Sequence, residues 1–293
     1  MFSIIVCSIN SVYLERLKLN LSQTIGHPYE LLVWDNLKEQ KPITEVYNLL
    51  AAQAQYPYWC FIHEDIRFET VNWSENLRVA FEQNPDTGLI GIAGARYKSR
   101  TPSGWSTGIS ELDFCNIYHE DKKLNRLHIY LNPNRTLFEP VVNVDGVFMV
   151  IRREVWKDAQ FNEGFLRGFH LYDIDFSFHV NKKWRAAVLF NIDILHFTEG
   201  GNYGDAWLEP TIRWHKKYCA ELPRFVSEKF AQQYTEIEIS KFWLRRLSVE
   251  NISWKNKWEW ILTSKTWRDP STWYATGLFL FGNFVRRKKQ KNS

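Results

Sequence analysis

Regular alternation of strand-like and helix-like segments over the first 95 residues constrains the fold of this chain more than any other feature. The first segment, Phe2–Cys7, is almost continuously apolar and rich in β-branched side chains, which is typical of a strand buried on both faces of a parallel sheet. Strands are predicted at 2–7, 29–34, 59–62 and 88–94, and helices at 11–25, 42–55 and 73–83. Strands that alternate with helices in this way predict an α/β fold with a doubly wound sheet.

Polar residues directly follow two of these strands. Asp35 and Asn36 come after the second strand, and His63-Glu64-Asp65 comes after the third. Crossover connections between parallel strands are right-handed, so the carboxyl ends of the strands lie along one edge of the sheet. Ligands of doubly wound sheets bind at that edge. The sequence therefore predicts a ligand site that contains these five residues.

The middle of the chain is less regular. Residues 96–140 show weak periodicity, and we expect an irregular insertion on the substrate side. A strand is predicted at 141–152, across Asp145-Gly146, and another at 186–194, just before Leu195-His196. A short helix at 153–160 and a helix that begins near Asp173 and ends near 183 are expected between them.

From Gly200 onward the sequence changes character. This part carries 8 of the 14 Trp residues and has helical periodicity. We therefore predict one main domain at 1–200 and a helical, Trp-rich C-terminal extension at 201–293.

Charge and cysteine content exclude several classes of protein. The net charge is only +4, and much of it lies in Arg286–Lys291, so we expect no nucleic-acid partner. The four cysteines form no CxxC pair, which argues against a zinc cluster and a disulfide framework. No cleaved signal is expected, and the longest apolar stretch, 273–285, is too short to span a bilayer. The expected location is the reducing cytoplasm.

The residues after the third strand are the first candidates for chemistry. No GxxxxGK[ST] or GxGxxG motif follows the first strand, so a diphosphate ligand would need a divalent cation held by carboxylates. Asp65 is the obvious ligand, although it could simply cap the loop before Arg67. His63 could contact metal or phosphate, or be a packing residue, and Glu64 could lie on the plain surface. His196 could complete a metal shell or be structural.

Two carboxylates near position 173 are the candidates for acid–base chemistry. Asp173 and Asp175 are two residues apart, so on a helix they point about 200° apart. One can face a cleft while the other caps the helix or is solvated, and alternatively both only favour the helix N-terminus electrostatically. The surrounding aromatic residues would raise the pKa of a buried carboxylate, as a general base requires.

Seven segments together resemble a known family. In chain order they are FSIIVCS, ELLVWDN, EVYNLLAAQA, WCFIHEDIRF, GLIGIAGAR, NVDGVFMVIRREVW and GFLRGFHLYDIDFSF. Their order and spacing over the first 220 positions resemble the family 2-type glycosyltransferases of the GT-A fold. The likeness is closest to a bacterial branch with a His-x-Asp variant of the DxD motif. His63 replaces the first Asp of that motif, which leaves metal dependence open, and Tyr172 replaces the Glu of the base motif.

The resemblance implies a fold, a reaction and a set of partners. The expected fold is a GT-A type, doubly wound, mixed and mostly parallel sheet flanked by helices, in which 1–200 is the nucleotide-sugar-binding and catalytic domain. The expected reaction transfers a sugar, with inversion, from a nucleotide-diphospho-sugar donor to a saccharide or lipid-linked acceptor, in bacterial surface polysaccharide synthesis.

The resemblance also implies roles for individual residues. Asp173 is the expected catalytic base, and Asp65 and His196 are the expected ligands of a divalent cation, Mn²⁺ or Mg²⁺. The expected nucleotide-sugar contacts are Ser8, Asp35, Asn36, Asn48, His63, Glu64, Asp145, Gly146 and His170.

Other classes of protein stay open as alternatives. A catalytically inactive relative could act as a saccharide-binding or scaffold protein. A nucleotidyltransferase or a methyltransferase should carry a glycine-rich loop after the first strand, and Ser8–Ser11 offers none.

Near the C-terminus, Trp254, Trp258 and Ile261 recur at helical spacing and predict a buried stripe. Alternatively, with Arg286–Lys291, they form a patch that contacts the membrane surface peripherally.

Overall fold

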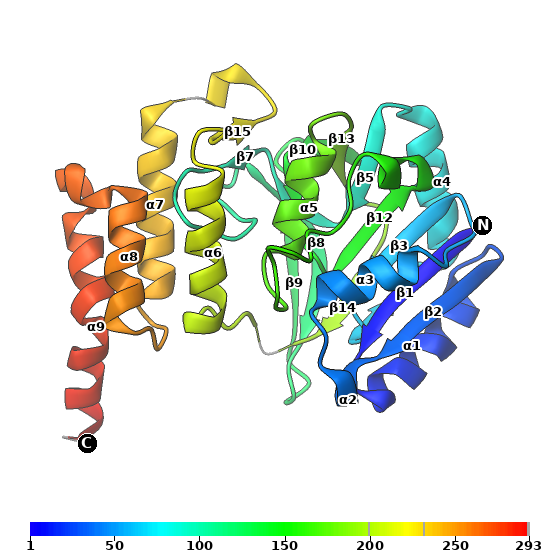
Figure 1. Ribbon diagram of the computed structural model, residues 1–293, viewed down its shortest axis with the longest axis horizontal. Helices are drawn as coiled ribbons and strands as arrows, with labels where there is room; N and C mark the ends of the chain where they lie inside the picture. Colours follow the sequence, from blue (N-terminus) through cyan, green and yellow to red (C-terminus); the bar gives the residue numbers. More distant parts are fainter. Residues whose placement is uncertain (199, 231, 292–293) are drawn as a thin grey trace. The chain divides into compact units, whose positions relative to one another are not determined.

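The computed structural model describes residues 1–198, 200–230 and 232–291, which form two compact units (Figure 1). The first unit comprises Met1–Arg96 and Asp113–Gly200. The second comprises Tyr97–Leu112 together with the chain from Gly201 onward. The second unit therefore includes a short excursion from within the predicted main domain, in addition to the C-terminal helices.

A seven-stranded mixed sheet forms the centre of the first unit. Its strand order is β10-β13-β5-β12-β3-β1-β2. The bounds are β1 Phe2–Ser8, β2 Tyr29–Asp35, β3 Tyr58–Ile62, β5 Thr87–Gly91, β10 Phe138–Val141, β12 Phe148–Arg152 and β13 Arg185–Leu189. Strand β1 is parallel to β2 and β3, whereas β12 is antiparallel to both of its neighbours, β3 and β5. The predicted mixed α/β sheet is confirmed.

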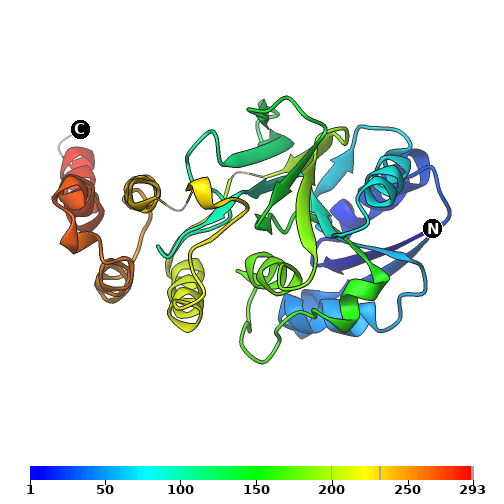
Figure 2. The same cartoon turned by 90° about the horizontal axis from the view of Figure 1, so that it is seen from above.

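Helices cover both faces of this sheet, as Figures 1 and 2 show. One face carries α1 (Ser11–Thr24) and α4 (Trp73–Gln83), and the other carries α3 (Ile43–Ala51) and α5 (Tyr172–Val180). Trp73 of α4 is fully buried and stacks on Phe68 with ring centroids 4.2 Å apart. These helices lie within about two residues of their predicted starts, because strong apolar periodicity marks buried helical faces.

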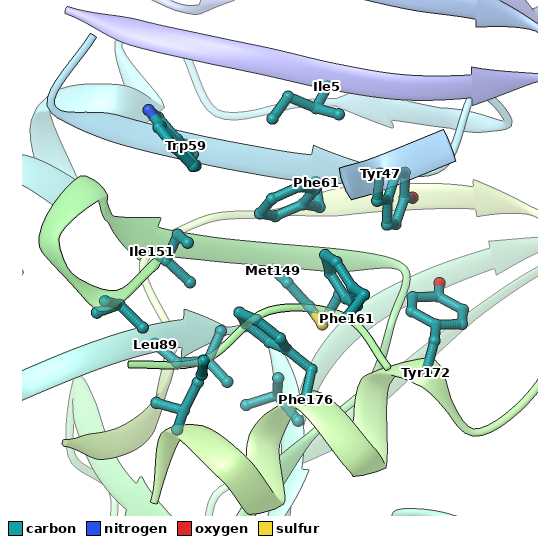
Figure 3. Close-up of a cluster of buried hydrophobic side chains, with 14 of the residues drawn as sticks. Ile5, Tyr47, Trp59, Phe61, Leu89, Met149, Ile151, Phe161, Tyr172 and Phe176 are labelled. Carbon is teal, nitrogen blue, oxygen red and sulfur yellow. The ribbon is translucent and has the colours of Figure 1, made fainter. Parts of the chain in front are cut away.

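An aromatic cluster beneath α3 and α5 fixes their position on the sheet (Figure 3). Phe61 of β3 and Met149 of β12 project into this cluster from the sheet, and Tyr47 of α3 meets them from the helix side. Phe176 of α5 stacks on Phe161 with ring centroids 4.4 Å apart. Each buried ring removes a large apolar area from water, so the cluster holds the N-terminus of α5 close to the end of β3.

A second sheet lies within the same unit, with strand order β11-β6-β8-β14-β4 and β9 paired to β8. Its strands are β4 Ile66–Phe68, β6 Ala93–Ala95, β8 Asp113–Glu120, β9 Arg126–Leu131, β11 Asn143–Val144 and β14 Ile194–Phe197. The prediction of an irregular insertion at 96–140 was therefore wrong. Strand β8 has no apolar alternation because it is buried on both sides and includes Asn116, whose amide donates to the carbonyls of Phe190 and Ile192.

Two predicted strands are divided between the sheets. The predicted strand at 141–152 becomes the end of β10, then β11 and β12, and the predicted strand at 186–194 becomes β13 and the start of β14. The predicted helix at 153–160 is a short 3-10 helix, η1 (Arg153–Lys157). As a consequence, His196 lies in the second sheet and not at an edge of the first.

The second unit is mainly helical. Its helices are α6 Asp205–Lys217, α7 Gln233–Leu247, α8 Trp254–Ser264 and α9 Trp273–Lys291, and the short strand β15 (Arg224–Phe225) pairs with β7 (Tyr97–Lys98). Trp214 and Trp260 are fully buried, and Trp207 stacks on Trp243. Within the described residues, no helix combines the length and apolar character needed to cross a membrane.

Candidate functional site

Asp65 and His196 are brought together by the pairing of two short strands. Strand β4 begins at Ile66, and its antiparallel partner β14 places His196 opposite Ile66. The backbone N–H of Phe197 donates to the carbonyl of Asp65 at 2.9 Å, which locks this register. The His196 Nε2 atom lies 3.4 Å from Asp65 Oδ2. The predicted juxtaposition is therefore present, although strand pairing within the second sheet creates it and not the edge of the first sheet.

His63 completes a cluster of three side chains. Its Nδ1 atom lies 3.9 Å from Asp65 Oδ1, and one ligand atom from each of His63, Asp65 and His196 lies within 4.8 Å of the other two. All three side chains are partly exposed, so an ion and its other ligands could reach them. Two imidazoles and a carboxylate form a mixed donor set, in which the carboxylate suits Mn²⁺ and the imidazoles favour a divalent transition metal over Mg²⁺.

The protonation states in this cluster favour metal binding. Burial lowers the pKa of His63, so its imidazole is neutral near pH 7. Burial alone would raise the pKa of Asp65, but its interactions with His196, His63 and the backbone together outweigh that effect and hold the pKa below its ordinary value. A neutral imidazole and an ionised carboxylate are the forms that bind metals.

Tyr172 links His63 to the backbone at Gly146. Its hydroxyl donates to the Gly146 carbonyl at 3.0 Å and lies 2.7 Å from His63 Nε2. Since the hydroxyl hydrogen is used on the carbonyl, His63 Nε2 must be the donor to the Tyr172 oxygen. That tautomer leaves the lone pair of His63 on Nδ1, the atom that faces Asp65. The Tyr that replaces the Glu of the family's motif thus orients His63.

Gly146 is required beside this tyrosine. A Cβ atom built at position 146 would lie 2.3 Å from the Tyr172 hydroxyl oxygen. Its backbone N–H donates to Asp173 Oδ2 at 3.1 Å. Neighbouring Asp145 accepts a hydrogen bond from the N–H of Val147 at 2.9 Å. The Asp145-Gly146 turn therefore lies against both residues that begin α5.

Asp173 has the character of a base that works near neutral pH. Burial, and then the negative charge of Asp145, raise the pKa of Asp173 to about 7, while backbone hydrogen bonds oppose the shift. Its side chain is partly exposed. Asp175 differs, because its side chain is only 1% exposed and its Oδ1 atom lies 3.7 Å from His179 Nε2. The alternative in which the second carboxylate is solvated was wrong, because α5 turns Asp175 into the protein interior.

Glu64 stabilises the loop between β1 and α1. It is 8% exposed and accepts hydrogen bonds from the Ser8 hydroxyl, from the N–H of Ile9 at 2.9 Å and from the N–H of Asn10 at 3.1 Å. The interpretation of Glu64 as a plain surface residue was wrong, because β1 and β3 are adjacent and their ends converge. Ser8 is likewise buried and engaged in this contact.

A cavity of about 470 Å³ opens beside the cluster. The predicted residues among its lining are Asn36, His63, Glu64 and Asp65. Lys41, Arg167 and Phe169 also line it, and sequence reasoning missed these three. The GFLRGF segment and the lysine after the second strand were visible in the sequence, but only folding places both at one cavity.

Three further predicted residues, Asp35, Asn48 and His170, do not line this cavity. Asp35 is exposed and caps α2 (Asn36–Glu39) by accepting from the N–H of Leu37. Asn48 donates to the Phe161 carbonyl at 2.9 Å and accepts from the Phe161 N–H at 3.2 Å, so it ties α3 to the segment after η1. Burial lowers the pKa of His170, which is partly exposed.

His119 is a further imidazole that sequence reasoning missed. Strand β8 pairs in parallel with β14, so His119 lies opposite His196 with ring centroids 5.6 Å apart. Burial, and then His196, lower its pKa. Nothing in the sequence indicated this position, because the segment that forms β8 was predicted to be irregular.

Comparison with known proteins gives one family and several related structures. Residues 3–200 match the family described as "Glycosyltransferase like family". Crystal structures of S. aureus TarS 1–349 are similar, alone (TM-score 0.53) and in complex with UDP-GlcNAc (TM-score 0.50). In both, identity is 13% over 89% of this chain, covering 78% and 79% of the TarS chains respectively.

GalNAc-T7 with UDP, GalNAc and Mn²⁺ has a TM-score of 0.52 at 10% identity, over 83% of this chain. This chain spans half the length of that GalNAc-T7 chain. No curated protein sequence matches significantly. At sequence identities this low, the similarity to these structures shows a shared fold and nothing more.

Proposed function

This chain belongs to the glycosyltransferase-like family and has the GT-A fold, and we propose that it transfers a sugar from a nucleotide-diphosphate donor to a hydroxyl group of a saccharide or lipid-linked acceptor. One observation carries the proposal. Two members of the His63, Asp65 and His196 cluster, His63 and Asp65, line a cavity, and His63 contacts Tyr172, the first residue of α5, which Asp173 directly follows. The proposed metal ligands and the proposed base are therefore close together, which supports such a transfer.

The cavity is suited to the nucleotide part of the donor. Its volume of about 470 Å³ lies in the range of small-molecule sites. Lys41 and Arg167 line it and could hold anionic oxygens, and Asn36 fixes the loop that carries Lys41 by hydrogen bonds to its N–H and carbonyl groups. The TarS complex contains UDP-GlcNAc and the GalNAc-T7 structure contains UDP, which supports a UDP-sugar as the first donor to test.

The donor set of the cluster fits a divalent cation. We propose that His63 Nδ1, the Asp65 carboxylate and His196 Nε2 hold Mn²⁺ in preference to Mg²⁺, because Mg²⁺ takes oxygen ligands and two of these three donors are nitrogen atoms. When bound, the cation supplies positive charge that stabilises the departing nucleoside diphosphate. Tyr172 contributes by holding the tautomer of His63 that can bind metal.

Asp173 is the proposed base. Its carboxylate takes the proton from the acceptor hydroxyl, whose oxygen then forms a bond to the anomeric carbon. The bond from that carbon to the diphosphate oxygen breaks in the same step, and the nucleoside diphosphate leaves with the electron pair. Because attack and departure occur on opposite faces, the configuration inverts. The Gly146 N–H holds one carboxylate oxygen at 3.1 Å and so orients the group.

A donor screen tests this proposal. Thermal shift and donor hydrolysis would be measured with UDP-, GDP- and dTDP-sugars, with and without Mn²⁺. We expect stabilisation by at least one nucleotide sugar and a larger shift with Mn²⁺ that is lost in Asp65→Asn. Absence of nucleotide binding under every condition would refute the proposal. Asp173→Asn, expected to bind nucleotide but not to transfer sugar, separates an enzyme from an inactive sugar-binding relative.

We also propose that the C-terminal part of the chain contacts a membrane surface peripherally. Trp254 and Trp258 are 42% and 50% exposed, so the predicted buried stripe was wrong for both, and only Ile261 is buried. The side chains of the basic cluster, Arg286–Lys291, lie outside the described residues. Exposed indole rings suit the interface of a membrane that carries a lipid-linked acceptor, as in surface polysaccharide synthesis on its cytoplasmic side.

Liposome flotation tests this contact. The full chain, Trp258→Ala and a chain that ends at Asp269 would be compared on anionic vesicles. We expect reduced flotation of both variants. Equal flotation of all three would remove the membrane contact and leave the transferase proposal intact.

A further inference from the structure

A second cavity, of about 540 Å³, lies within the second unit. Four segments of that unit line it: β7 with the loop after it, the C-terminal part of α6 with the loop after it, the start of α7 and the end of α8. The lining residues used below are Tyr97, Arg100, His215, Cys219, Glu236 and Lys265. The family match ends at residue 200, so it assigns no role to the helices that build this cavity.

His215 gives the cavity a buried acceptor. The side chain is 1% exposed, and its Nδ1 atom lies 2.7 Å from the carbonyl oxygen of Thr211. A carbonyl can only accept, so Nδ1 carries the hydrogen and Nε2 presents a lone pair. Within the described part of the chain, His215 Nε2 has no hydrogen-bond partner. Burial also holds the pKa of His215 well below its ordinary value, so the ring stays neutral.

An orphaned acceptor of this kind needs an explanation, since nearly all buried polar atoms in folded proteins have a partner. Because Nε2 accepts, its missing partner must be a donor such as a hydroxyl group. A ligand hydroxyl inside the cavity would give Nε2 the hydrogen-bond donor that it lacks and remove the cost of leaving it unpaired.

Two cations line the same cavity. Arg100 and Lys265 are both exposed, and neither side chain forms an ion pair among the described residues. The nearby Glu236 carboxylate is already occupied, because it accepts from the Tyr97 hydroxyl at 2.8 Å and from the Ser99 hydroxyl at 2.8 Å. It also accepts from the backbone N–H of Arg100 at 3.2 Å. The guanidinium and ammonium groups are therefore available to an anion.

We propose that this cavity binds an anionic saccharide. Arg100 and Lys265 hold its phosphate or carboxylate group, and a ring hydroxyl donates to His215 Nε2. The volume accommodates a mono- or disaccharide. This site goes beyond the proposed transfer reaction, because all of its residues belong to the second unit and binding there requires neither the donor nor a metal.

Direct binding tests the charge requirement. Titration calorimetry on the full chain would compare glucose 1-phosphate, glucuronate, glucose and inorganic phosphate. We expect both anionic sugars to bind at least tenfold more tightly than glucose and than inorganic phosphate. Binding of inorganic phosphate as tight as that of glucose 1-phosphate would overturn the saccharide assignment, and equal binding of glucose would overturn the role of the cations.

Substitutions locate the site. Arg100→Ala combined with Lys265→Ala should weaken binding of the anionic sugars at least tenfold. Arg245→Ala combined with Lys255→Ala removes the same charge from exposed positions outside the cavity lining and should leave binding unchanged. Equal affinity of both double variants would overturn the proposal. His215→Phe removes the hydrogen-bond acceptor at similar volume and should also weaken binding. If this variant does not fold, the comparison of the two double variants still decides the test, because all four of their positions are exposed.

Cys219 provides a reporter inside the cavity. It is exposed, whereas Cys60 and Cys115 are buried and burial raises the pKa of Cys7 to about 11. Mass spectrometry would follow modification of Cys219 by a maleimide. We expect glucose 1-phosphate to slow it at least threefold and UDP to have no effect. Protection by UDP alone would assign the cavity to a nucleotide and refute the saccharide proposal while leaving the transferase proposal standing.

Discussion

Asp145→Asn tests the origin of the raised pKa of Asp173. The shift from 3.8 to about 7 is about 3 units and corresponds to about 4 kcal/mol of preference for the protonated form. Burial is the first cause and Asp145 the second, so removing the charge of Asp145 should lower the pKa of Asp173 by about one unit, well short of the whole shift. Asn keeps the oxygen that accepts from the Val147 N–H, so the turn should be preserved.

The expected readout is the pH dependence of kcat. A base acts only as the carboxylate, which at a pKa of about 7 makes up about one tenth of the molecules at pH 6 and about nine tenths at pH 8. For the wild-type chain, kcat should therefore rise with a midpoint near pH 7 and fall about tenfold per unit below pH 6. For Asp145→Asn the midpoint should move to about pH 6, measured with saturating donor, acceptor and Mn²⁺.

The pH dependence of stability gives an independent check, because protonation of Asp173 should remove the base and at the same time stabilise the fold. The folded-state pKa of Asp173 lies above the unfolded value of 3.8, so protonation favours the folded state. This contribution, at most about 4 kcal/mol, is complete below the unfolded pKa and is lost as the pH rises through about 7. Asp173→Asn should therefore have a higher Tm than the wild-type chain at pH 8 and a similar one at pH 4. Identical kcat midpoints for the wild-type chain and Asp145→Asn would refute the electrostatic reasoning.

Three further substitutions probe the framework of the site. Gly146→Ala should destabilise the fold by about 1–3 kcal/mol in denaturant unfolding, because the new methyl group meets the buried Tyr172 hydroxyl, whereas Gly164→Ala has open space and should be neutral. Tyr172→Phe should weaken Mn²⁺ binding about 10–100-fold in calorimetry, because His63 loses the partner that sets its tautomer, and unchanged affinity would contradict that role. Glu64→Gln should lower Tm by an amount equivalent to about 1–3 kcal/mol, since one amide oxygen cannot serve three donors, and wild-type stability would show that the loop needs no such anchor.

Local pattern was enough to predict most elements in the first third of the chain. The apolar strands and amphipathic helices up to residue 91 were predicted because each buries a continuous run or a periodic face, which a single sequence displays. The second sheet was missed because its strands are short or contain buried polar residues such as Asn116, whose partners are distant in the sequence. No local pattern reveals a hydrogen bond to a carbonyl 74 positions away.

The candidate site could likewise be predicted only in part from the sequence. The residues that follow strands, such as Asp65, could be predicted because strand ends mark ligand edges. The roles of Glu64 and Tyr172 could not, because both depend on contacts made across the fold, to the β1–α1 loop and to His63 respectively. Arg167 and Lys41 reach the cavity from loops, whose conformation has no periodic signature.

The pairing of β4 with β14 has a consequence for how the chain folds. The two strands that unite Asp65 and His196 are far apart in the sequence, since β4 ends at Phe68 and β14 begins at Ile194, and the contact of His63 with Tyr172 spans 109 positions. Contacts of such high sequence separation carry a large loop-closure cost and form late in folding. We therefore expect the His63, Asp65 and His196 cluster to be absent from early folding species, and a cation that binds only the completed cluster to slow unfolding without accelerating the first steps of folding.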